Sequence, residues 1–192
     1  FDLDCSGTNR TFNKNRRPGE IKSHHYIISY DPRDASDCGL TGEKAQELSL
    51  EVAQKMFPGH QALVVTHTDG ENHSGNIHTH IVINSVRANE TEKEDYMTQA
   101  SDYKAGGKHR STNKFMEHFK KEVMAMCERE GLHQIDLLSP APEKVTEAEF
   151  RAKSRGQEKM EKINKKITAE GLKPSATTFQ TQKDFLRKAI KD

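Results

Sequence analysis

The chain has 192 residues, of which 31% are charged and only 32% hydrophobic, so it has apolar material for one modest core rather than two. Its net charge of +1 neither favours nor excludes nucleic acid as a partner. Three widely spaced cysteines without a CxxC pair argue against a disulfide framework or a zinc–cysteine site and fit a reducing, cytoplasmic compartment. No apolar stretch is long enough for a membrane span, and no signal peptide opens the chain.

The first sixty residues predict one strand and one helix. Residues 1–23 are polar and indicate a loop or a loosely held helix. A short strand is expected at His25–Tyr30, because its residues are β-branched or aromatic, and Asp31-Pro32 ends it. Thr41 fits the N-cap of a helix with apolar residues at helical spacing, which Pro58-Gly59 stops.

Two further strands, Ala62–His67 and Ile77–Val86, flank a turn-rich stretch at residues 68–76. Segments this close in sequence can pair as an antiparallel hairpin. Residues 87–110 then indicate a long polar loop, and Thr112 fits the cap of a helix that ends at Gly131.

The remainder of the chain predicts a short strand within Leu132–Leu138, a Pro-containing linker and then helices. Thr146 and Glu149 form a capping box that opens a long, charged helix, and a last helix lies near the end of the chain. We therefore predict an α+β fold. A central antiparallel sheet with flanking helices is expected in residues 1–138, and a helical extension in residues 139–192.

Three of the ten histidines are placed so that they can meet. His78 and His80 are two residues apart in a strand, so both side chains project from one face. His67 ends the preceding strand and lies across from His78 or nearly so, where opposed Cβ atoms are about 4.5–5.5 Å apart. Three neutral nitrogen donors with open positions for substrate are what a catalytic metal needs. The competing interpretation is a pair of half-buried polar residues.

Three residues near this cluster in the sequence are further candidates for the same site. Asn84 continues the same face of the strand and is expected to reach the site. Asp69 is either a carboxylate that orients a histidine ring or only a turn residue. His73 is close in sequence but lies in the loop.

Basic residues gather after the hairpin. From Lys104 to Lys121 there are six Lys or Arg residues and a single acid, and a second basic cluster spans Arg151–Arg155. Such a run is either a phosphate-binding face or a solvated helix surface. The residues expected to contact DNA phosphates are Lys108, Arg110 and Lys114.

The stretch VVTHTDGENHSGNIHTHIVINSV resembles motif III of the relaxases, the mobilisation nucleases of the HUH superfamily, with a longer loop than the tightest versions. The pattern is a histidine followed by xD, a loop, and HxHxxxN, which falls here on His67, Asp69, His78, His80 and Asn84. Softer matches on both sides extend the resemblance over residues 20–192 and point to the MOBP class. His25 and Ser29 stand where this class often has a histidine and a serine. Ser29 is either a contact to the DNA backbone or an ordinary strand residue.

The resemblance implies an antiparallel sheet that carries the histidine cluster and helices on one side. It implies a divalent cation on the three histidines: manganese, cobalt, nickel, zinc or copper suits imidazole ligands, whereas magnesium is usually bound by oxygen. A tyrosine would attack the phosphorus and become linked to the 5′ end of a nicked strand. The partners would be single-stranded or hairpin DNA of an origin of transfer in the bacterial cytoplasm, with accessory relaxosome proteins and a coupling protein.

The sequence departs from the family at the nucleophile. Motif I, which carries the catalytic tyrosine, is not found. Tyr26 and Tyr30 fit sheet positions, and Tyr96 and Tyr103 follow motif III in a loop. Because the chain does not begin with Met, we expect the tyrosine upstream of Phe1.

Three other functions compete with that of a relaxase. A cupin-like oxygenase needs many more strands, and a two-histidine phosphoesterase needs two H-x-[ST] motifs in separate strands. The serious alternative is a DNA-binding module that does not nick.

Overall fold

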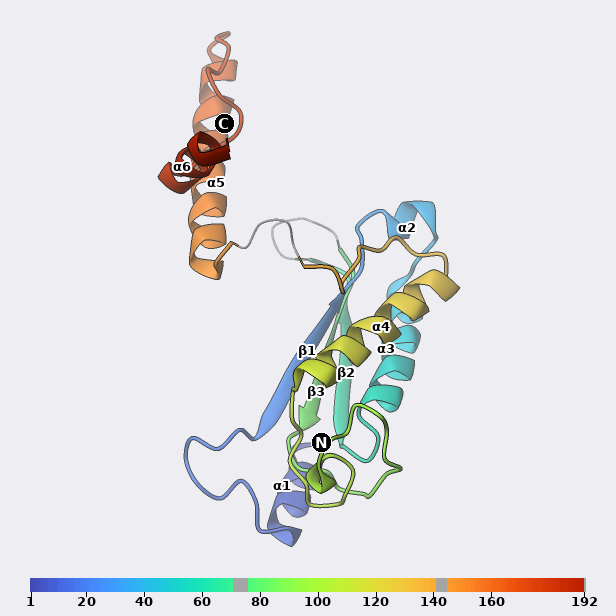
Figure 1. Cartoon of the computed structure of the whole chain (residues 1–192). Coiled ribbons are helices and arrows are strands. Elements are labelled where there is room, and N and C mark those ends of the chain that lie inside the picture. The colour runs from blue at the N-terminus through green and yellow to red at the C-terminus, as the bar shows by residue number, and fades with distance from the viewer. Residues whose placement is uncertain (71–75, 141–144, 192) are drawn as a thin grey trace. The chain divides into compact units, whose positions relative to one another are not determined.

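The computed structural model describes residues 1–70, 76–140 and 145–191. Contacts divide the chain into two compact units, Phe1–Ser139 and Pro140–Asp192. The fold is α+β, with a three-stranded antiparallel sheet and flanking helices in the first unit and helices in the second. Figure 1 shows the strands and helices of both units. The position of His73 lies outside the described residues.

The sheet consists of β1 (Ser23–Ser29), β2 (Ala62–His67) and β3 (His78–Asn84), in the order β1-β3-β2. The predicted hairpin of β2 and β3 is present, with His67 directly opposite His78. The first strand pairs with the other edge of β3, and its register places Ser29 opposite His78. The central strand β3 is therefore hydrogen-bonded on both sides, and its side chains alternate between two faces of the sheet.

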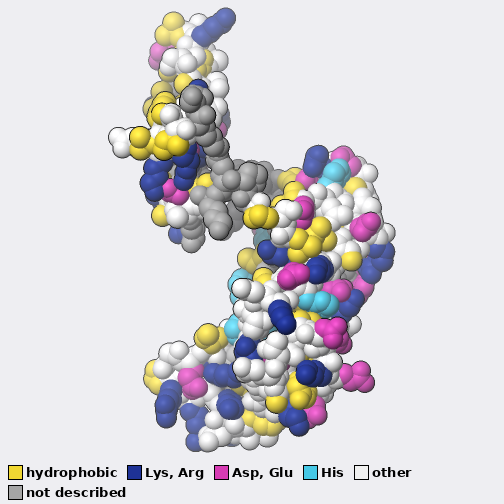
Figure 2. Space-filling view, viewed as in Figure 1, with side chains coloured by type: hydrophobic (Ala, Val, Ile, Leu, Met, Phe, Trp, Pro, Cys, Tyr) yellow, Lys and Arg dark blue, Asp and Glu magenta, His cyan; other side chains and the backbone are white. Residues whose placement is uncertain are grey.

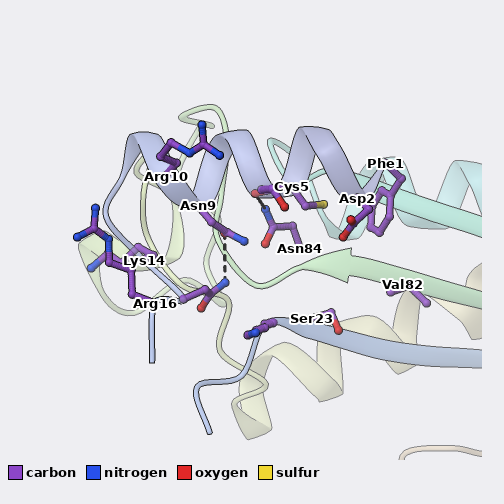
Figure 3. A pocket seen from close by; sticks show the side chains of 13 residues that line it. Phe1, Asp2, Cys5, Asn9, Arg10, Lys14, Arg16, Ser23, Val82 and Asn84 are labelled. Carbon is purple, nitrogen blue, oxygen red and sulfur yellow. Dashed lines mark hydrogen bonds between the residues drawn. The ribbon is translucent and has the colours of Figure 1, made fainter. Parts of the chain in front are cut away.

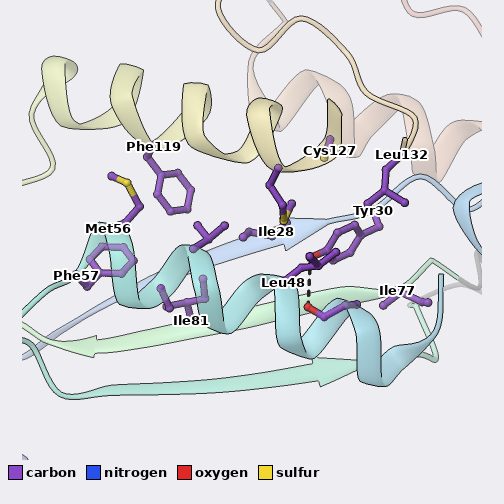
Figure 4. Packing of buried hydrophobic residues seen from close by; sticks show 14 of the residues in the cluster. Ile28, Tyr30, Leu48, Met56, Phe57, Ile77, Ile81, Phe119, Cys127 and Leu132 are labelled. Atoms are coloured by element: carbon purple, nitrogen blue, oxygen red, sulfur yellow. Dashed lines mark hydrogen bonds between the residues drawn. The ribbon is translucent and has the colours of Figure 1, made fainter. Parts of the chain in front are cut away.

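One face of the sheet is covered by α3 (Gly42–Met56) and α4 (Asn113–Arg129) and forms the core. Figure 4 shows core side chains of the helices and strands in contact, with Ile81 of β3 below α3 and Phe119 pointing down from α4. Both helices begin at the predicted caps, since the hydroxyls of Thr41 and Thr112 accept hydrogen bonds from backbone N–H groups three residues on. We call this the core face.

The opposite face of the sheet carries the alternate residues of each strand. They include His25, His67, His78, His80, Val82 and Asn84, together with the exposed apolar residues Ile27, Leu63 and Val65. We call this the histidine face. The end of the histidine face that carries Asn84 is covered by α1 (Asp2–Thr11). The Asn84 side-chain amide there donates to the Cys5 carbonyl oxygen at 3.5 Å.

Several elements differ from the sequence prediction. Residues 2–11, for which both a loop and a loosely held helix were expected, form a helix, and an unexpected short helix, α2 (Asp34–Asp37), follows β1. The predicted strand within Leu132–Leu138 is wrong: no β-ladder forms there, and Asp136 instead caps a turn by accepting from the N–H groups of Leu138 and Ser139. The loop at residues 87–110 contains a 3-10 turn, η2 (Ala100–Asp102), whose backbone accepts a hydrogen bond from buried Arg87.

The second unit contains α5 (Glu147–Ala169), which has the predicted capping box, and α6 (Gln182–Lys191). Polar contacts hold its parts together: Asn164 donates to the Ala176 carbonyl at 2.8 Å, and Lys183 and Arg187 lie beside the Glu149 carboxylate. Gly156 is needed where the Phe179 ring crosses α5, since a Cβ there would lie 2.2 Å from the ring. In the described residues, no helix is both long and apolar enough to cross a membrane.

Candidate functional site

The sheet brings His67, His78 and His80 together on the histidine face. The centroids of the three imidazole rings lie 5.1–5.3 Å apart in every pair. Three imidazoles that bind one ion through nitrogen at about 2.1 Å, with tetrahedral angles, have ring centres roughly 5 Å apart. The spacing of the rings therefore fits a three-histidine site.

Each of these rings has a polar partner for Nδ1. His78 Nδ1 lies 3.3 Å from the Asn76 carbonyl oxygen, His67 Nδ1 lies 3.8 Å from the Asp69 carboxylate, and His80 Nδ1 lies 2.7 Å from a nitrogen of His25. A hydrogen bond from Nδ1–H fixes the tautomer and leaves the lone pair on Nε2. For His78 the Asn76 contact leaves Nε2 as a potential ligand. The donor in the pair of His25 with His80 depends on the tautomer, and the 3.8 Å between His67 and Asp69 exceeds hydrogen-bond distance. Bringing one nitrogen of each ring to a single point needs rotation about χ2, which is a broad torsion for histidine.

Among the predicted residues, His25 reaches the cluster through β1. Its ring stacks on that of His80 at a centroid distance of 4.9 Å, and its Nε2 is the atom that contacts His80 Nδ1. Burial, followed by the neighbouring histidines, lowers the pKa of His80. Ser29 lies at the other end of β1, opposite His78, where its hydroxyl accepts from the Asn76 amide at 2.7 Å.

Asn84 shares the histidine face but not the site. It lies six residues along β3 from His78, roughly 20 Å at the usual rise of a strand. Its side chain is buried under α1 and donates to Gln61 Oε1 at 2.9 Å. The expectation that Asn84 touches the three histidines is not met, because strand geometry carries it to the far end of the face.

A cavity of about 650 Å³ lies between α1 and the sheet at this far end. Figure 3 shows its lining side chains, with Val82 and Asn84 on β3 below the helix. Four of the lining residues are basic and one is acidic: Arg10, Lys14, Arg16, Lys22 and Asp2. Figure 2 shows Lys and Arg side chains gathered at the end of the first unit that holds α1 and the loop after it. Sequence reasoning missed this surface, because its residues are dispersed among polar ones and converge only through α1.

Of the predicted DNA-contacting residues, Lys108 and Arg110 lie in the segment that leads into α4, and Lys114 lies in the helix itself. Lys108 Nζ lies 3.5 Å from the Glu20 carboxylate, and Arg110 is 3.4 Å from the Asp102 carboxylate. Lys114 is exposed in the first turn of α4. The segment runs along the core side, since the adjoining Ser111 hydroxyl is 2.6 Å from the Tyr26 hydroxyl, and Tyr26 packs against the core face.

Three tyrosines, Tyr26, Tyr30 and Tyr96, have their contacts away from the histidine cluster. The Tyr26 hydroxyl contacts His109 at 2.6 Å, and Tyr30 is buried beside the Ser49 hydroxyl, where burial raises its pKa to about 12. The Tyr96 hydroxyl is buried, and its ring stacks on His118 of α4. These three side chains belong to the core side of the sheet.

A second group of potential ligands was not expected from the sequence. Among the described residues, the one set of three ligand atoms within 4.8 Å of one another belongs to Asp34, Cys38 and His133. The first two belong to α2 and its C-cap, and the third follows α4. The DxxxC spacing at Asp34 and Cys38 is a weak signal, and the histidine that completes the group is almost a hundred residues away.

An antiparallel sheet with helices over one face and three neighbouring histidines on the other is the architecture expected of an HUH nuclease. Residues 6–132 match the family model described as relaxase, MobA/VirD2-like, nuclease domain. This is more than half of the chain, so the chain belongs to the MobA/VirD2-like relaxase family.

Two curated relatives are both named Protein rlx and come from Staphylococcus aureus. One is 35% identical over 112 residues, which are 58% of this chain and 28% of the relative. The other is 26% identical over 171 residues, which are 87% of this chain and 44% of the relative. The chain thus spans less than half of the length of these relatives. No solved structure matches it significantly.

Proposed function

We propose that residues 1–138 are the metal-binding nuclease core of a relaxase, and that residues 139–192 are a helical extension of it. The reaction is nicking of one DNA strand at an origin of transfer, with the 5′ end retained on a tyrosine. The observation that carries this proposal is the proximity of the His67, His78 and His80 rings on an open sheet face in a chain of the relaxase family.

A divalent cation fits the three histidines by the chemistry of the donor set. All three donors are imidazoles, a set that suits manganese, cobalt, nickel or zinc better than magnesium. When bound, the ion supplies Lewis-acid stabilisation of charge on the oxygens of the scissile phosphate. The role of His25 is to hold the His80 ring by the 2.7 Å contact, and the Asp69 carboxylate, 3.8 Å from His67 Nδ1, is close enough to orient that ring after a small movement.

The attacking tyrosine is proposed to come from a segment outside residues 1–192. Tyr26, Tyr30 and Tyr96 are engaged on the core side of the sheet, and a hydroxyl there cannot reach a phosphate on the histidine face. This is also the observation that favours the alternative, in which the chain by itself binds DNA without nicking it.

The DNA is proposed to lie as a single strand across the histidine face, because the scissile phosphate must be exposed there. Ser29, opposite His78, can donate its hydroxyl to a phosphate oxygen beside the metal. Beyond Val82 the strand would enter the basic cavity under α1, roughly 20 Å from His78. Accessory relaxosome proteins and a coupling protein are further proposed partners of the whole protein.

The test uses the full-length protein and a supercoiled plasmid that carries the origin of transfer. His78→Ala and His80→Ala should each lower the nicking rate by about 1000-fold or more, because the Lewis acid contributes several kcal/mol in the transition state. Binding of the uncut oligonucleotide should change much less. His118→Ala is the matched control, since His118 lies on α4, over the core face.

Nicking at the wild-type rate by either variant in chelator-treated buffer would refute the metal site. The alternative is tested separately with an oligonucleotide that traps the covalent intermediate. The 192-residue chain should bind it without forming a covalent adduct, whereas the full-length protein should form one. An adduct on Tyr26, Tyr30 or Tyr96 of the shorter chain would refute the assignment of the nucleophile to another segment.

A further inference from the structure

The group formed by Asp34, Cys38 and His133 has the distances of a metal site. The Asp34 Oδ1 atom lies 2.8 Å from His133 Nδ1, and Cys38 Sγ lies 3.8 Å from each of these atoms. Tetrahedral ligands at zinc-like bond lengths of about 2.0–2.3 Å are roughly 3.3–3.6 Å from one another. Shifts of a few tenths of an ångström would therefore place all three atoms around one ion.

The surroundings of the group resemble those of bound ligands. The second ring nitrogen of His133, Nε2, faces the Asp37 carboxylate at 3.5 Å, and metal-bound histidines usually donate their other N–H to such a group. The Asp34 carboxylate is only 1% exposed and is oriented by backbone N–H groups of Asp31 at 3.1 Å and His133 at 2.8 Å. Its direction is thus fixed without the help of an ion.

The charges of the group favour a divalent cation. Asp34 supplies a buried carboxylate, and the Cys38 sulfur lies 3.8 Å from its Oδ1 atom. The neighbouring guanidinium, Arg33, contacts Asp31 at 2.8 Å instead. One carboxylate, one thiolate and one neutral imidazole around an ion of charge +2 give a neutral cluster, and binding would release the thiol proton.

We propose that Asp34, Cys38 and His133 bind a thiolate-preferring divalent ion, zinc by its chemistry, at a site separate from the histidine face. The ion joins α2, which follows β1, to the segment that follows α4. A water completes its coordination, and Asp37 orients the His133 ring. The site is structural, because it links α2 to the segment that follows α4 and contains none of the residues of the histidine face.

The test is titration of the chain with Co²⁺, followed by its thiolate-to-metal charge-transfer band in the near ultraviolet. Imidazole and carboxylate ligands do not produce this band, so the signal reports a cysteine ligand even when the histidine face also binds the ion. We expect the band in the wild type and in a His78→Ala/His80→Ala variant, and its loss in Cys38→Ser and His133→Gln. Cys5→Ser is the matched control and should retain the band, since Cys5 lies on α1.

A second measurement guards against variants that fail to fold. Zinc should raise the thermal midpoint of the wild type and of Cys5→Ser but not that of Cys38→Ser, whose far-ultraviolet circular dichroism at low temperature is compared first. Asp37→Asn should keep the band and weaken zinc affinity about 10–100-fold, the usual effect of losing an outer carboxylate. Absence of the band in the wild type, or its persistence in Cys38→Ser, would overturn the proposal and leave Asp34 and His133 as a hydrogen-bonded pair only.

Discussion

Histidines lie on both sides of the sheet, in opposite environments. On the histidine face, His67, His78 and His80 gather on an open surface. On the core side, His109 is surrounded by the rings of Tyr26, Phe57 and Phe115, and its Nε2 contacts the Tyr26 hydroxyl. Burial lowers its pKa to about 3 and that of neighbouring His60 to about 4. A high histidine count therefore reflects two unrelated uses of the ring, one for a surface site and one for packing.

The largest expected effect is a difference in the free energy of unfolding between substitutions on the two faces of the sheet. Ile81→Ala should lower the free energy of unfolding by about 2–5 kcal/mol, because Ile81 is fully buried under the helices. Val65→Ala on the histidine face should cost about 1 kcal/mol or less, since Val65 is 41% exposed. Urea unfolding followed by circular dichroism measures both. Equal losses would mean that the histidine face is covered in solution.

A smaller effect is expected from the buried histidines. A histidine whose pKa is lower in the folded state binds fewer protons than in the unfolded state, so its contribution is complete above about pH 6.5 and is lost as the pH falls toward about 4. Each such histidine should cost about 1.4 kcal/mol per pH unit in that window. The chain should therefore become markedly less stable in mild acid.

His109→Gln sharpens this prediction, because glutamine can still hydrogen-bond the Tyr26 hydroxyl. The variant has its own cost at pH 7, which is measured first and subtracted. Between about pH 6.5 and pH 5 its free energy of unfolding should then fall by about 2 kcal/mol less than that of the wild type. Parallel curves for the two proteins would show that His109 does not carry the acid sensitivity.

Short sequence signals predicted the helix starts and strand faces, because these depend on residues that are close together in the chain. The caps at Thr41, Thr112 and Thr146 are present, and strand alternation with the hairpin put His67, His78 and His80 on one face. What the sequence did not indicate depends on long-range pairing. The contact of His25 with His80 requires β1 to pair with the edge of β3 that does not face β2. The β1 sequence does not specify this pairing.

The same limit explains the missed sites. The burial of Asn84 depends on α1, more than seventy residues earlier, and the polar sequence of that helix did not predict that it covers the sheet. Asp34 and His133 meet only because α4 returns its C-terminal end to the α2 segment. Residue types and spacing fix which face of a strand a side chain occupies, whereas the partner across a long loop comes from the complete fold.

The smallest expected effect distinguishes two sets of basic residues as the contact to DNA. One set is Lys108, Arg110 and Lys114, in which the first two already have carboxylate partners at 3.5 and 3.4 Å. The other is Lys14, Arg16 and Lys22, which line the cavity at the end of the histidine face. A cation already paired with a carboxylate releases fewer counterions when DNA binds, because its charge is partly neutralised before binding.

Salt titrations of oligonucleotide binding compare the two triple-alanine variants with the wild type. Each phosphate contact to single-stranded DNA contributes about −0.7 to the slope of log affinity against log salt. The Lys14/Arg16/Lys22 variant should therefore have a slope shallower by about 2, and the Lys108/Arg110/Lys114 variant by about 0.7, from Lys114 alone. If the second variant has the larger change, the strand lies along the segment leading into α4, and the pairs with Glu20 and Asp102 must open when DNA binds. If neither slope changes, the cluster Arg151–Arg155 of the second unit becomes the next set to substitute.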